Sequence, residues 1–163
     1  MRIFLDGCDG TGKSTLAKYL SERFNLDIFC LTKNSEKSIG KYKELLSINN
    51  VVHDRTFLSE MVYPPIFERD SWLKHFDVCK LIDSYSINDG IIVICTAPDE
   101  IIRKRINTRC NLEYQEIVDN ISYINSTYKF LARTYDLLLV NTNISSLEEI
   151  GDEIERRLNN GKY

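Results

Sequence analysis

Short apolar runs alternate along the chain with longer segments in which apolar residues recur every three or four positions. A short continuous apolar run is typical of a strand buried on both faces, and the wider spacing is typical of an amphipathic helix. The strands predicted in this way are residues 2–6, 26–31, 51–54, 91–96 and 136–140. The predicted helices are residues 14–24, 35–46, 56–67, 72–87, 99–108, 113–135 and 147–158.

This alternation of strands and helices predicts an α/β fold. Strands that are connected through helices form parallel sheets, so we expect three layers, with about five parallel strands and helices on both faces. The chain has 163 residues, and two halves of it would each be too small for a good hydrophobic core. We therefore expect a single domain over residues 1–163.

Composition and charge narrow the class of protein. Hydrophobic residues make up 43% and charged residues 28% of the chain, which is ordinary for a globular enzyme. The net charge of −3 argues against a surface that attracts nucleic acid, although a local basic groove remains compatible with it. No apolar run approaches the roughly 20 residues that cross a bilayer. Asp6 interrupts the first apolar run too early for a signal peptide, so we expect a cytoplasmic protein without a membrane partner.

Residues 7–14, GCDGTGKS, match the phosphate-binding pattern G-x-x-x-x-G-K-[ST] in full, between a predicted strand and a predicted helix. Glycines permit a tight turn whose N–H groups face phosphate oxygens, and the positive end of the following helix points at the same oxygens. In this phosphate-binding loop (P-loop), Lys13 is expected to reach the β- and γ-phosphates of ATP, and Ser14 to bind Mg²⁺. The residues expected to bind ATP are Gly7, Asp9, Gly10, Thr11, Gly12, Lys13, Ser14 and Thr15.

GTPases, ring-forming ATPases and kinases all use a P-loop, and the rest of the chain distinguishes them. The sequence lacks the N-K-x-D element with which regulatory GTPases read their base. It also lacks a hydrophobic strand ending in the pair of acids with which a hydrolase would activate water, and ring-forming ATPases need a longer chain. A small kinase is the class that remains.

A second candidate site follows the predicted strand 51–54. Asp54 stands at the carboxyl end of this strand, where ligands bind in open α/β sheets. Its carboxylate could orient a magnesium-bound water or accept a proton from an acceptor hydroxyl, and Arg55 could clamp an acceptor phosphate. An Asp-Arg pair can also form an ordinary surface turn, but the P-loop upstream favours the functional interpretation.

A basic cluster follows the predicted strand 91–96 and contains Arg103, Lys104, Arg105 and Arg109. In kinases of this kind, mobile arginines close over the γ-phosphate, neutralise its charge and exclude water. A charge run is often only the solvated face of a helix. Its place in the order of elements favours a lid, which we expect around residues 103–113.

Taken together, these motifs resemble the thymidylate kinase family, and the related deoxynucleoside kinases share much of the same pattern. The resemblance depends on Asp9 within the P-loop, on the stretch DRTFLSEMVY at residues 54–63, and on the arginine-rich segment. It follows the order of motifs over most of the chain and is specific at residues 5–16, 51–63 and, loosely, 102–116.

The resemblance implies a role for each matched residue. Lys13 and Ser14 serve ATP and Mg²⁺, and Asp9 faces the sugar hydroxyl of the acceptor or the metal. Asp54 and Arg55 meet the acceptor phosphate or the reacting hydroxyl, and we place Asp54 with Ser14 at the metal.

The lid is implied in the same way. Arg105 and Arg109 match an R-x-x-x-R spacing, and the P-loop itself contains no arginine. This resembles the subgroup of the family that supplies its catalytic arginine from the lid.

The base-binding segment departs from the family pattern. It is short, and Pro64-Pro65 replaces the glutamine expected after the tyrosine of the DR stretch. Side chains that could stack on or bind a pyrimidine are Phe57, Tyr63, Phe67, Arg69 and Trp72. Aromatic residues at helical spacing also form hydrophobic cores, so each of them has two interpretations.

The leading hypothesis is transfer of phosphate from ATP to a deoxynucleoside monophosphate, above all dTMP to dTDP. The alternatives are a deoxynucleoside kinase, with Asp54 as base on a 5′-hydroxyl, and a kinase of a hydroxymethylated pyrimidine in DNA. The alternative without catalysis is an ATP-binding switch module. A homodimer is common among the enzymes that the chain resembles and stays open here.

Overall fold

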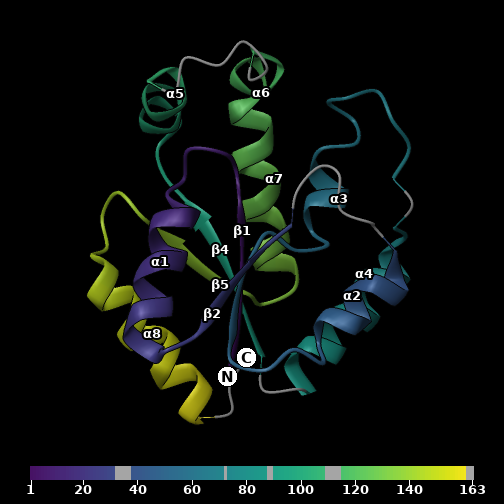
Figure 1. Ribbon diagram of the computed structural model, residues 1–163. Helices are drawn as coiled ribbons and strands as arrows, with labels where there is room; N and C mark the ends of the chain where they lie inside the picture. The colour runs from purple at the N-terminus through teal and green to yellow at the C-terminus, as the bar shows by residue number, and fades with distance from the viewer. Residues whose placement is uncertain (32–37, 72, 88–89, 109–114, 161–163) are drawn as a thin grey trace.

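The computed structural model describes residues 1–31, 38–71, 73–87, 90–108 and 115–160 (Figure 1). Within these ranges the chain forms a five-stranded parallel sheet in the order β2-β3-β1-β4-β5. The strands are β1 (Arg2–Gly7), β2 (Asp27–Cys30), β3 (Val51–Asp54), β4 (Gly90–Thr96) and β5 (Leu138–Asn141). The sequence predicted all five strands, and the α/β class is confirmed.

Helices cover both faces of the sheet, as the sequence predicted. In Figure 1, α1 (Lys13–Phe24) and α8 (Leu147–Asn160) lie together on one side, and α2 (Ile39–Leu45), α4 (His75–Ile87) and α7 (Ile121–Thr134) lie on the other. Side chains of β1 divide between two cores: Ile3 and Leu5 pack with α1 and α8, and Phe4 packs with α4 and α7. Alternate residues of a strand face opposite sides of its sheet, so a run apolar at every position supplies both cores.

The strand order brings the predicted motifs to one edge of the sheet. β1 lies between β3 and β4, with Leu5 in register with both Asp54 and Val93. All strands are parallel, so their carboxyl ends lie at the same edge, and that edge carries the P-loop, Asp54 and the residues after β4 and β5.

Two predicted helices differ from the structure in their extent. The segment 56–67 contains only the short helix α3 (Ser59–Val62), because Pro64 and Pro65 follow and proline disfavours helical backbone in the residue before it. The predicted helix 113–135 is broken at Asn120 into α6 (Gln115–Asp119) and α7. The Asn120 side chain donates a hydrogen bond to the Glu116 carbonyl at 2.9 Å, a local bond that competes with continuous helix.

The remaining helix on this edge, α5 (Asp99–Asn107), follows β4 and carries Arg103 and Arg105. None of the helices in the described part of the chain is long and apolar enough to cross a membrane.

His53 is a buried core residue of β3. Its ring stacks on Phe4 at a centroid distance of 4.7 Å and meets the edge of Phe29 at 5.5 Å. Neither ring nitrogen has a hydrogen-bond partner, and the side chain is 1% exposed. Burial therefore lowers the pKa of His53 to about 4, with Arg2 adding to the shift.

This burial predicts a pH-dependent stability. Between about pH 6.5 and about pH 4 the unfolded chain protonates His53 and the folded chain does not, so the free energy of unfolding falls as pH drops through this window. The loss is about 1.4 kcal/mol per pH unit, or about 2 kcal/mol between pH 6.5 and 5. Urea unfolding of the wild type and of His53→Leu at both pH values measures it. The variant should lose about 2 kcal/mol less than the wild type, and parallel losses in the two proteins would contradict the assignment.

Candidate active site

The P-loop joins β1 to α1 through three glycines with positive φ: Gly7 at 142°, Gly10 at 78° and Gly12 at 84°. These conformations strain any other residue. At Gly7 a Cβ would also lie 2.2 Å from the carbonyl oxygen of Cys95 on the neighbouring strand β4. The loop is therefore tight because β1 and β4 are in contact at the point where it leaves the sheet.

Lys13 folds back over the P-loop. Its Nζ donates hydrogen bonds to the carbonyl oxygens of Gly7 at 2.8 Å and Cys8 at 2.9 Å, and the residue is 5% exposed. Thr11 closes the same turn, because its hydroxyl donates to the Cys8 carbonyl at 2.7 Å. Lys13 is the first residue of α1, so its charge lies beside the positive end of that helix, where anions bind.

Ser14 and Asp54 meet across the junction of the P-loop and β3. The Ser14 hydroxyl donates to Asp54 Oδ2 at 2.8 Å. Ser14 and Thr15 are exposed, and Asp54 is 7% exposed. A hydroxyl and a carboxylate are the hard oxygen donors that Mg²⁺ prefers, so the residues that the sequence predicted as the metal site lie together and fit that ion.

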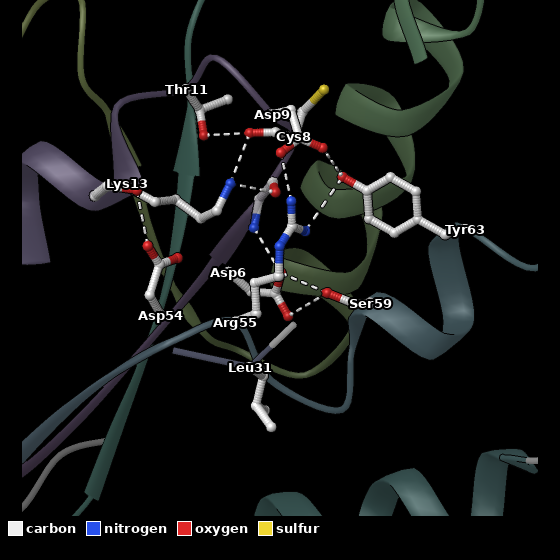
Figure 2. Close-up of polar contacts among 12 residues, drawn as sticks. Asp6, Cys8, Asp9, Thr11, Lys13, Leu31, Asp54, Arg55, Ser59 and Tyr63 are labelled. Atoms are coloured by element: carbon white, nitrogen blue, oxygen red, sulfur yellow. Dashed lines mark hydrogen bonds and ion pairs between the residues drawn. The ribbon is translucent and has the colours of Figure 1, made fainter. Parts of the chain in front are cut away.

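Arg55, Asp9 and Tyr63 form a second cluster beside the P-loop. The Arg55 guanidinium forms an ion pair with Asp9 and lies 5.4 Å from the Tyr63 ring centre. The Tyr63 hydroxyl donates to the other Asp9 oxygen at 3.0 Å. Figure 2 shows the three side chains converging, with Lys13 and Asp54 on the other side of the loop. Burial raises the pKa of Tyr63 well above its ordinary value, so its hydroxyl keeps the proton that it donates.

Arg105 reaches the P-loop from α5. Its Nη1 donates to the Gly10 carbonyl at 3.2 Å and to the hydroxyl of Thr142, just after β5, at 3.3 Å. Arg103 instead donates to the Val118 carbonyl at 2.9 Å, away from the loop. Arg109, the second arginine of the predicted lid pair, lies outside the described residues, and so does Trp72.

The structure separates the three other side chains predicted to bind a base. Phe57 is 0% exposed and packs edge-on against Tyr42 and Tyr85, so it belongs to the hydrophobic core. Phe67 is 40% exposed and stacks on Tyr63 at a centroid distance of 6.2 Å, next to the Arg55 cluster.

Arg69 is the third of these side chains. It forms a two-pronged ion pair with the carboxylate of Glu60 at 2.6 and 3.1 Å, and Glu60 is 1% exposed. This pair fixes the loop that follows α3 to the helix itself.

Sequence reasoning missed the best connected polar residue of the site, Asp6. This carboxylate at the end of β1 is 0% exposed. It accepts hydrogen bonds from five donor groups: Gly7 N at 2.9 Å, Thr56 N at 3.0 Å, Thr56 Oγ1 at 2.6 Å, Ser59 Oγ at 3.0 Å and Tyr128 Oη at 2.7 Å. The one indication in the sequence is an acid that ends a buried strand directly before the P-loop.

The donors to Asp6 come from four segments. They are the P-loop, the turn after β3, α3 and α7. The carboxylate therefore holds residues 55–63 against the first residue of the P-loop.

Comparison with known proteins agrees with this geometry. No family model matches the chain. A protein named probable thymidylate kinase from Methanocaldococcus jannaschii is 25% identical over 98% of this chain and 96% of its own length.

Among solved structures, the YorR protein of Bacillus subtilis, described in complex with phosphorylated GDP, matches with a TM-score of 0.79 and 24% identity. That match covers 98% of this chain and 96% of the other. Deoxyadenosine kinase from M. mycoides with bound dCTP matches with a TM-score of 0.61 and 20% identity, over 98% and 100% of the two chains. With the complete motif on this fold, the chain is a P-loop kinase similar to thymidylate and deoxynucleoside kinases.

The hydrogen bond from Tyr128 to Asp6 predicts that loss of one hydroxyl on α7 lowers the stability of the fold. Tyr128→Phe removes one donor from a fully buried carboxylate, and should lower the free energy of unfolding by about 2 kcal/mol. Urea unfolding at pH 7 measures this. Tyr123→Phe, on the same helix but exposed, is the matched control and should change stability by less than about 0.5 kcal/mol. Equal stability of the two variants would show that Asp6 does not depend on Tyr128.

Proposed function

We propose that this kinase transfers the γ-phosphoryl group of ATP to a deoxynucleoside monophosphate, with dTMP to dTDP as the leading case. One observation carries the proposal: the last residue of β3 and the residue directly after it lie on opposite sides of the P-loop. Asp54 joins Ser14 on the side expected to hold the donor, and Arg55 joins Asp9 and Tyr63 on the other side. A kinase needs a donor site and an acceptor site, one on each side of the phosphoryl group that is transferred.

On the donor side, the P-loop N–H groups, Lys13 and the start of α1 bind the β- and γ-phosphates. Lys13 exchanges its hydrogen bonds to the Gly7 and Cys8 carbonyls for phosphate oxygens, so its charge is never left unpaired. Ser14 and Asp54 hold Mg²⁺, which neutralises phosphate charge when bound.

On the acceptor side, Arg55 binds the phosphate of the monophosphate, and Asp9 and Tyr63 orient its sugar. Phe67, stacked on Tyr63 and partly exposed, supplies an aromatic face for the base. An oxygen of the acceptor phosphate attacks the γ-phosphorus. The bond from that phosphorus to the β–γ bridging oxygen breaks, and ADP leaves with the electron pair.

The lid completes the site. Arg105 lies against the P-loop, and we propose that it acts with Arg109 in the lid expected around residues 103–113, which would cover the transferring group and exclude water. We propose that the lid and both substrate sites belong to a single domain. The name of the relative from Methanocaldococcus jannaschii supports the choice of thymidylate, since that likeness covers almost the whole of both chains.

A second acceptor class, a deoxynucleoside, is favoured by the charges around the site. Arg55 is paired with Asp9, and Arg69 with Glu60, so the charge of each arginine is already compensated. Compensated charge suits an acceptor without a phosphate. In that reaction Asp54 would accept the proton of the attacking 5′-hydroxyl.

An acceptor panel separates these functions. ADP formation is measured with ATP, Mg²⁺ and, in turn, each deoxynucleoside monophosphate, each deoxynucleoside, and duplex DNA containing hydroxymethylated pyrimidines. We expect turnover with a monophosphate, fastest with dTMP, and a loss of roughly 100- to 1000-fold in kcat for Lys13→Ala. Turnover on nucleosides or DNA alone would replace the proposed acceptor. ATP binding without acceptor-stimulated ADP formation would leave only a nucleotide switch.

The contact between Ser14 and Asp54 predicts the magnesium requirement. Asp54→Asn keeps the shape and removes the charge, so it should raise the Mg²⁺ concentration for half-maximal activity about 10-fold or more. Asp27→Asn, at the amino end of β2 and far from the P-loop edge, is the control and should leave the requirement unchanged. The rate of ADP formation, measured as a function of Mg²⁺ concentration, gives this requirement for each variant. Identical curves for the two variants would show that Asp54 does not bind the metal.

A further inference from the structure

Thr142 is the first residue after β5, and the sheet fixes its backbone. Its N–H donates to the Thr96 carbonyl at 2.9 Å, which extends the pairing of β4 and β5 beyond Asn141. The side chain is half-buried at the P-loop edge. None of the sequence motifs includes this residue.

The hydroxyl of Thr142 lies between the P-loop and α5. Oγ1 donates to the Thr11 carbonyl at 2.6 Å and accepts from Arg105 Nη1 at 3.3 Å. A hydroxyl has one proton and two lone pairs, and the short bond to Thr11 uses the proton, so the lone pairs are left for the guanidinium. Threonine thus fits both neighbours at once, whereas a valine of the same shape would fit neither.

Arg105 is held at one end and remains able to bind at the other. Its hydrogen bonds to described residues, those to Gly10 and Thr142, both use Nη1. Nη2 and Nε keep their donors for a further acceptor. Gly12 borders the same place, because a Cβ on it would lie 3.4 Å from Thr142 Oγ1 and 3.8 Å from Arg105 Nη1. The guanidinium therefore lies at the turn that leads into Lys13.

We propose that Thr142 is a positioning residue that holds Arg105 against the P-loop, so that the arginine meets the transferring phosphoryl group without having to be ordered first. An unrestrained arginine side chain loses much rotamer freedom when it binds, and a preorganised one loses less. The benefit is largest where negative charge develops during transfer, which places most of it in kcat. A smaller part lies in the affinity for ATP, because the γ-phosphate is already charged before transfer. This inference rests on the proposed kinase function and names a residue that acts through Arg105.

Two substitutions of Thr142 in the full chain test the proposal. Thr142→Val keeps the shape and removes the hydroxyl, and Thr142→Ser keeps the hydroxyl. With ATP, Mg²⁺ and the fastest acceptor, Thr142→Val should lower kcat about 10-fold with less than a twofold change in the acceptor KM, and Thr142→Ser should stay within about twofold of wild type. Thr127→Val is the control for loss of a hydroxyl that donates to a backbone carbonyl, here that of Tyr123, and should not change kcat.

A double-mutant cycle with Arg105→Met asks whether Thr142 acts through the arginine. In that background Thr142→Val should cost less than about twofold in kcat. An equal loss in both backgrounds would overturn the proposal, as would a Thr142→Ser variant as slow as Thr142→Val.

The dissociation constant of ATP in the presence of Mg²⁺, measured for the same four proteins, gives a second double-mutant cycle that does not depend on turnover. There we expect the two substitutions to be non-additive. If the wild type binds ATP and transfers nothing, the proposed function fails by itself. Additive effects on ATP affinity would then overturn the role of Thr142 as well.

Discussion

The arrangement of the active site depends on one buried carboxylate, that of Asp6. Removing an ionised group from water costs several kcal/mol unless hydrogen bonds compensate it, and hydrogen bonds to a charge are the strong ones. Asp6 satisfies this demand with backbone N–H groups and hydroxyls from the P-loop, the turn after β3, α3 and α7. Each donor has to be in place for the charge to be tolerated at 0% exposure, so the four segments are fixed relative to one another.

The charged groups that we propose to bind the substrates are likewise paired with partners in the protein. In the structure, Lys13 donates to loop carbonyls and Arg55 is paired with Asp9. At Lys13 and Arg55, binding of a phosphate therefore exchanges one acceptor for another. At Lys13 the exchange favours phosphate, because phosphate oxygens accept more strongly than peptide carbonyls. At Arg55 it favours phosphate less, because Asp9 is already a charged acceptor.

Most of the fold could be predicted from the sequence, because the spacing of apolar residues and the residues that end each helix or strand are local properties of the chain. Every strand was found, and the contact of Ser14 with Asp54 followed from a rule about where parallel strands end. Asp6 could not be found in this way, since one of its donors, Tyr128, is 122 residues distant and reaches it only through packing of α7 on the sheet. The sequence leaves Phe57 open between a base-binding side chain and a core residue for a related reason. Helical spacing shows that a ring is on a face, and only the neighbours Tyr42 and Tyr85 show that this face belongs to the core.

Arg55 shows how the end of β3 divides its two side chains between two sites. Successive residues of a strand point to opposite faces, but Asp54 and Arg55 both have to stay at one edge of the sheet. The chain achieves this by a left-handed backbone at Arg55, with φ of 81°, a conformation that costs a non-glycine residue about 1–2 kcal/mol. The Arg55 N–H still bonds to the Leu5 carbonyl at 2.8 Å, so the turn begins while the residue is hydrogen-bonded to β1. A glycine would adopt this turn without strain but has no guanidinium, and the ion pair with Asp9 and the contact with Tyr63 offset the strain that the arginine introduces. The strain at this residue is thus the consequence of placing next to each other in sequence a carboxylate that bonds to Ser14 and a cation that pairs with Asp9.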